Sequence, residues 1–99
     1  MAFAVTITSA AQFDIEETCR YIFFELENPQ AAAKLATDIY DAIDTLDEFP
    51  LRNPLWRNEP WKSRGVHSLP VDNYLVFYSV DETRNIVTVL RVFYSRRNV

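Results

Sequence analysis

Residues 73–94 read NYLVFYSV-DETRN-IVTVLRVFY, and they give the clearest structural signal in the chain. Two runs of β-branched and aromatic residues flank a polar five-residue segment, Asp81 to Asn85. Apolar runs around a short polar segment predict a β-hairpin. The second run contains one charge, Arg91, and a cation in so apolar a strand is costly unless it meets water or a partner. We therefore expect a hairpin with one covered face and one face that meets something else.

The hairpin and the residues that follow it, YSRR (94–97), resemble the RelE/ParE superfamily, the toxins of bacterial type II toxin–antitoxin modules. The resemblance continues upstream in NPQAA (28–32), FP (49–50) and RGVHSLP (64–70), so it covers nearly the whole chain. Each piece is weak alone, whereas their order and spacing together are fairly specific. The resemblance implies an α+β fold, a single toxin domain over residues 1–99, no metal or other cofactor, and a cognate antitoxin protein as partner.

Length and composition exclude several classes of protein. The chain has 99 residues, 48% of them hydrophobic, which fits one globular domain and not a disordered chain. No apolar run approaches the roughly 20 residues of a membrane span, and the N-terminus lacks the features of a secretory signal. The single cysteine, Cys19, cannot form an internal disulfide. We expect a cytoplasmic protein with no membrane partner.

The net charge of −4 conceals two halves of opposite sign. Residues 1–60 hold eleven acids and four bases, whereas residues 61–99 hold three acids and six bases. A pI near 4.8 argues against strong non-specific binding of nucleic acid, although a local basic patch stays possible. Asp44, Asp47 and Glu48 crowd the end of the second predicted helix. We interpret them as a solvated face with Arg52 as a counterion, or alternatively as a patch for a cationic partner.

The residue pattern predicts the element order β-α-α-β-β-β. Residues 3–8 alternate as in a strand, and the Ser-x-x-Gln pattern beginning at Ser9 predicts a capping box that starts the first helix. Asn28 and Pro29 have the types that cap and open a second helix. Residues 50–62 form a proline-rich loop with two tryptophans, and residues 65–70 a further strand. We expect a helical hairpin packed on one face of a small, mostly antiparallel sheet.

Apolar residues at helical and strand spacing predict the core. On the first helix they form one continuous stripe of Ile15, Cys19, Ile22, Phe23 and Leu26. The residues expected to be mostly buried are Ile15, Ile22, Leu35, Ile39, Ile43, Val76, Tyr78, Leu90 and Val92.

Arginines near the end of the chain are the main candidates for a functional surface. Simple alternation puts Arg91 on one face with Val87, Val89 and Phe93, opposite Leu90 and Val92. A guanidinium there suits a phosphate or an acidic partner, and the structural alternative is an ion pair or a solvated edge. The residues expected to bind target or antitoxin are Arg64, Arg91, Tyr94, Arg96 and Arg97.

His67 is the only histidine, so a two-histidine metal site is impossible. It could transfer a proton alone, although a structural role is the more common one. Cys19, on an apolar stripe, fits packing better than nucleophilic chemistry. We expect activity to depend on Arg91, Arg96 and Arg97 and not on His67 or Cys19.

The resemblance leaves two kinds of toxin open. RelE-like members cut mRNA in the ribosome with basic residues on an open sheet face, and ParE-like members are associated with inhibition of DNA gyrase. Val66, Ser68 and Leu75 stand where the RelE-like pattern carries cations, and too few cations weaken such catalysis. We therefore favour a ParE-like toxin that binds gyrase, neutralised by an antitoxin with an acid-rich segment.

Two alternatives stay open. The first is a ribosome-dependent mRNA endoribonuclease that would use Arg96, Arg91, Tyr94 and His67. The second is a degenerate member that binds its antitoxin and poisons nothing.

Overall fold

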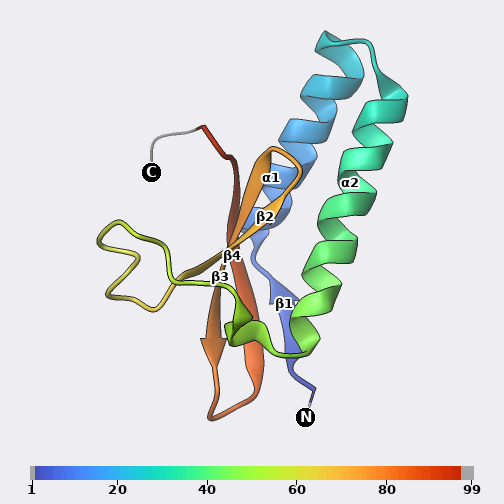
Figure 1. Cartoon of the computed structure of the whole chain (residues 1–99). Helices are drawn as coiled ribbons and strands as arrows, with labels where there is room; N and C mark the ends of the chain where they lie inside the picture. The colour runs from blue at the N-terminus through green and yellow to red at the C-terminus, as the bar shows by residue number, and fades with distance from the viewer. Residues whose placement is uncertain (1, 97–99) are drawn as a thin grey trace.

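The computed structural model describes residues 2–96 and consists of two helices on one face of a four-stranded sheet (Figure 1). The sheet has the order β1-β4-β3-β2, with β1 parallel to β4 and the other pairs antiparallel. This arrangement confirms the predicted α+β fold and its element order. The elements are β1 (Ala4–Ile7), α1 (Ser9–Arg20), a π-helical turn (Tyr21–Glu25), α2 (Pro29–Asp44), β2 (His67–Val71), β3 (Tyr74–Asp81) and β4 (Ile86–Tyr94).

Both helices begin at side-chain caps. Thr8 Oγ1 accepts a hydrogen bond from the Ala11 N–H at 3.1 Å, so Thr8 is the N-cap of α1. The predicted capping box was therefore wrong by one position, because Ser9 is already the first helical residue. At α2, Asn28 caps and Pro29 opens the helix, as predicted. Within residues 2–96, no helix combines the length and the apolar character needed to cross a membrane.

A β-bulge in β4 changes which side chains face the helices. Phe77 lies opposite Arg91 and Tyr78 lies opposite Val89, so Leu90 is one extra residue between the two pairs. A bulge of this kind shifts the alternation of the strand beyond it. The strict alternation predicted for β4 was wrong for Val87, Val89 and Leu90: both valines pack under the helices, and Leu90 packs on the opposite face.

The main core lies between the helical hairpin and the sheet. Most residues expected to be buried are buried there, while Ile22 and Leu90 are only partly covered. The buried members of this cluster are Ala11, Ile15, Leu35, Ile39, Ile43, Leu46, Val71, Val76, Tyr78, Val87, Val89 and Val92.

The tryptophan loop covers the other face of the sheet. The Phe77 ring is 5.0 Å from the Trp56 ring and 4.6 Å from the Trp61 ring, measured between centroids, and both contacts are edge-on. Phe93 joins this second cluster. Figure 1 shows the loop, in yellow-green, on the side of the sheet away from the helices. The second face of the hairpin therefore meets this loop, and the open face expected around Arg91 is covered in part by the chain itself.

Candidate functional site

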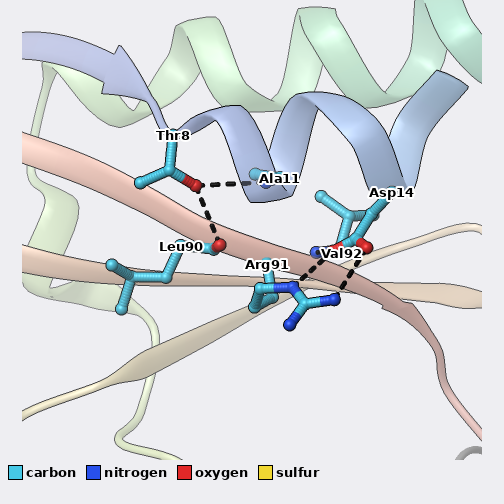
Figure 2. A network of polar contacts seen from close by, with 6 residues as sticks. All are labelled: Thr8, Ala11, Asp14, Leu90, Arg91 and Val92. Atoms are coloured by element: carbon cyan, nitrogen blue, oxygen red, sulfur yellow. Dashed lines mark hydrogen bonds and ion pairs between the residues drawn. The ribbon is translucent and has the colours of Figure 1, made fainter.

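Arg91, the cation inside the terminal hairpin, is held by a carboxylate of the first helix (Figure 2). Asp14 of α1 accepts hydrogen bonds from Arg91 Nε at 2.8 Å and from Arg91 Nη2 at 2.9 Å. These bonds raise the pKa of Arg91, and a two-pronged contact also fixes the direction of the guanidinium. The guanidinium carbon lies 4.5 Å from the centroid of the Phe93 ring. The ion pair, which was the structural alternative for Arg91, is the arrangement present.

The same network bonds to the edge of β4 beyond the point where its pairing with β1 ends. The pairing of β1 with β4 stops at Ile7. Beyond it, Thr8 Oγ1 donates to the Leu90 carbonyl at 2.9 Å, and Asp14 accepts from the Val92 N–H at 3.0 Å. Side chains at the start of α1 thus pair with backbone groups that a longer β1 would otherwise satisfy. Sequence reasoning missed Asp14 in this role, because it lies 77 positions from Arg91 and no local pattern links the two.

The sheet face that carries Arg91 is otherwise mostly apolar. Ser68 lies opposite Phe77, and Phe77 lies opposite Arg91, so these three form one row across the sheet. Val66 and Ser68 are buried, and Leu75 packs against the tryptophan cluster. The positions at which RelE-like patterns carry cations are therefore covered in this protein.

His67 is a buried packing residue. Its Nδ1 lies 2.7 Å from the Asn53 carbonyl, which can only accept, so Nδ1 carries the hydrogen. The ring stacks on Tyr78 with 5.3 Å between centroids, and only 9% of the residue is exposed. Tyr78 donates to the Pro50 carbonyl at 2.6 Å. His67 thus joins β2 to the start of the tryptophan loop, and little of it is accessible to a substrate.

The remaining sequence candidates are exposed and lie on separate elements. Arg64 lies in the last turn of the tryptophan loop, Tyr94 ends β4, and Arg96 follows β4. Tyr94 meets Tyr74 edge-on at 5.5 Å. Arg97 lies outside the described residues. In residues 2–96, no three His, Cys, Asp or Glu side chains gather as a metal site would require.

A groove of about 490 Å³ lies between the end of the helical hairpin and the turn that joins β2 to β3. Tyr21 and Leu26, from the end of the first helix, each expose 56% of their surface. Burial raises the pKa of Tyr74 on the opposite wall. Exposed apolar surface of this kind is typical of a docking site. The lining residues are Tyr21, Ile22, Leu26, Leu35, Asp72, Asn73, Tyr74 and Tyr94.

The predicted apolar stripe of the first helix was wrong at its end. Phe23 and Leu26 continue the predicted apolar stripe, yet both are exposed. The reason is that α1 changes to a π-helical turn after Arg20 and passes beyond the sheet that would have covered them. A π turn rotates the following side chains away from the helical face, and such turns are frequent at functional sites.

Comparison with known proteins gives one family. Residues 5–99 match the family model of the ParE toxin of the type II toxin-antitoxin system, parDE. No curated protein matches the chain in sequence. In solved structures, the chain is similar to the chromosomal ParDE toxin–antitoxin system of P. aeruginosa, with a TM-score of 0.75 and 19% identity over 94% of this chain and 96% of that one.

Two further solved structures have the same fold. The toxin–antitoxin complex RelBE2 of Mycobacterium tuberculosis has a TM-score of 0.65 and 23% identity over 95% of this chain and 99% of that one. The archaeal RelE–RelB complex of Pyrococcus horikoshii OT3 has a TM-score of 0.66 and 14% identity over 99% of this chain and all of that one, 100%. Since the family match spans nearly the whole chain and the fold agrees, this chain belongs to the ParE toxin family of type II toxin–antitoxin systems, within the RelE/ParE superfamily.

Proposed function

We propose that this protein inhibits growth by binding DNA gyrase in the ParE-like manner and does not cut RNA. The observation that carries the proposal is the state of the sheet face around Arg91. A metal-independent ribonuclease needs preorganised cations to stabilise the charge that develops on the phosphate. Here Arg91 is paired with Asp14, and Phe77 beside it lies beneath the tryptophan loop. These contacts leave the face poorly suited to phosphate chemistry.

The charge of the whole chain supports a protein target. A net charge of −4 repels the phosphates of mRNA and ribosomal RNA. A toxin that reaches its target by protein–protein contact avoids this penalty. The free thiol of Cys19 fits action in the reducing cytoplasm, where gyrase works.

A cognate antitoxin is the second partner in the proposal. The similar solved structures are described as toxin–antitoxin systems or complexes, and the groove at the end of the helical hairpin offers room for apolar side chains of a peptide. We assign the antitoxin to this groove, with Tyr21, Leu26 and Tyr94 as its apolar contacts. Acidic side chains of the antitoxin would pair with Arg96 and with Arg97 at the chain end.

Two assays in parallel test the target. Purified protein is added to a gyrase supercoiling reaction and to a ribosome-dependent mRNA cleavage reaction. Inhibition of supercoiling without mRNA cleavage supports the proposal. Cleavage without an effect on gyrase would replace it with the ribonuclease alternative.

The antitoxin groove is tested by copurification with the product of the neighbouring small reading frame. Leu26→Asp places a charge in the groove and should weaken the complex at least tenfold. Phe13→Asp is the matched control, since Phe13 is 60% exposed on α1 and does not line the groove. If both variants lose the same antitoxin affinity, or if neither loses any, the antitoxin does not bind in this groove.

A further inference from the structure

The turn after α2 presents one aromatic side chain to solvent. Phe49 exposes 79% of its surface, more than any other large apolar residue in residues 2–96. It borders an open hollow of about 770 Å³. The lining residues are Ala2, Phe3, Glu48, Phe49, Pro50, Leu51, Arg52 and Asn85.

The backbone on both sides of Phe49 is firmly held. Arg52 Nη1 donates to the carbonyls of Glu48 at 2.7 Å and Phe49 at 3.2 Å, and Arg52 Nη2 donates to Thr45 Oγ1 at 2.7 Å. The Pro50 carbonyl accepts the hydroxyl of buried Tyr78. Phe49 itself has φ 50° and ψ 51°, a left-handed conformation that bulky side chains rarely adopt. The backbone that carries the ring is therefore held in place, which lowers the entropy cost of docking it.

The surroundings of the ring are acidic. Glu48 precedes Phe49 and lines the hollow, and Asp44 and Asp47 come shortly before it in the chain. Asp44 and Glu48 are exposed, and Asp47 is partly exposed. Arg52 also lines the hollow, but its guanidinium bonds to carbonyl and hydroxyl oxygens and forms no ion pair with a carboxylate of residues 2–96, so these three acids and Arg52 together keep a net negative charge. An apolar anchor with an acidic border suits a protein surface with an apolar recess and basic side chains around it. It does not suit nucleic acid, whose phosphates these carboxylates would repel.

We propose that Phe49, Leu51 and the acids Asp44, Asp47 and Glu48 form the surface that contacts the protein target of the toxin. This inference rests on the proposed function, since it requires a protein target. The surface lies at the C-terminal end of α2, whereas the antitoxin groove is lined from the N-terminal half of the same helix and shares no residue with the hollow beside Phe49. Figure 1 shows the two ends of α2 far apart. A change at Phe49 should therefore affect the target and leave antitoxin binding intact.

Phe49→Gly is the test variant, because glycine accepts φ 50° without strain and the fold is kept. Phe13→Ala removes a comparably exposed ring from α1 and is the matched control. Each protein is measured for inhibition of purified gyrase, for growth arrest on induction, for antitoxin copurification and for thermal unfolding. Phe49→Gly should inhibit gyrase about 30-fold less well or worse, the loss expected for an interface hot spot. Its antitoxin binding and melting temperature should not fall.

Glu48→Lys supplies a second readout, since charge reversal should weaken inhibition most at low salt. If Phe49→Gly inhibits gyrase as strongly as the wild-type protein does, or if Phe13→Ala loses as much inhibition as Phe49→Gly, the inference is overturned and the proposed function stands. If wild-type protein arrests growth without inhibiting gyrase, the proposed target is wrong. If Phe49→Gly then arrests growth as strongly as the wild-type protein, the assignment of this surface to the target is wrong as well. If the wild-type protein is a dimer and Phe49→Gly makes it a monomer, the surface binds a second copy and the inference is overturned. If the wild-type protein neither arrests growth nor inhibits gyrase, both proposals are overturned.

Discussion

Replacing Asp14 with alanine should destabilise the protein more than replacing any other acidic side chain of α1. Its side chain is only 10% exposed, and its loss leaves the Val92 N–H without an acceptor, at a cost of about 1–3 kcal/mol. The Arg91 side chain is 39% exposed, so water replaces much of the ion pair, which contributes about 0.5–1 kcal/mol. The free energy of unfolding should fall by about 1.5–4 kcal/mol, which lowers the melting temperature by roughly 6–30 °C.

Urea unfolding followed by the fluorescence of Trp56 and Trp61 measures this loss. Glu17→Ala is the control, because Glu17 is 52% exposed on the same helix and its ion pair with Arg20 is 3.6 Å long. That variant should change stability by less than about 0.5 kcal/mol. A double-mutant cycle with Arg91→Met separates the ion pair from the Val92 bond. If Asp14→Ala is no less stable than Glu17→Ala, α1 does not hold the β4 edge in this way and the reasoning fails.

Three further predictions concern the core, the thiol and the histidine. Ile39 is fully buried, so Ile39→Ala should lower the free energy of unfolding in urea by about 2–5 kcal/mol, and a loss below 1 kcal/mol would remove it from the core. Burial raises the pKa of Cys19, so iodoacetamide should label the folded protein slowly at neutral pH, with faster labelling at alkaline pH and in urea; equal rates in folded and unfolded protein would contradict this. His67→Asn keeps a donor near the Asn53 carbonyl, so gyrase inhibition should stay within about twofold, whereas a nuclease that used His67 would lose about 10²–10⁴-fold.

Local sequence signals predicted the elements because those signals are physically local. The polar segment between the last two strands forms the turn, where Asp81 Oδ1 accepts from the N–H groups of Thr83 and Arg84, and Asn85 has φ 56°. Asn28 and Pro29 act within one helical turn. The hairpin, the cap of α2 and the tryptophan anchors could all be predicted without knowing what lies across the molecule, whereas the cap predicted for α1 was one position late.

The surfaces could not be predicted in the same way, because they depend on contacts between distant residues. The extra residue Leu90 reverses which side chains of β4 face the helices, and the alternation of apolar residues in a strand does not predict such a bulge. The side on which the tryptophan loop folds determines whether Arg91 meets solvent, and Asp14 determines what Arg91 binds. Phe49 was noted only as part of a family resemblance, although an aromatic residue in a proline turn beside three acids was the available signal.

A supercoiling titration decides whether this ParE-family protein acts by binding gyrase. Purified wild-type protein is titrated into a gyrase supercoiling reaction, and its antitoxin is then added. Supercoiling should be inhibited at a saturating toxin concentration, and the antitoxin should restore it. If supercoiling stays unaffected while the same preparation cleaves mRNA on ribosomes, the protein is a ribonuclease and gyrase is not its target.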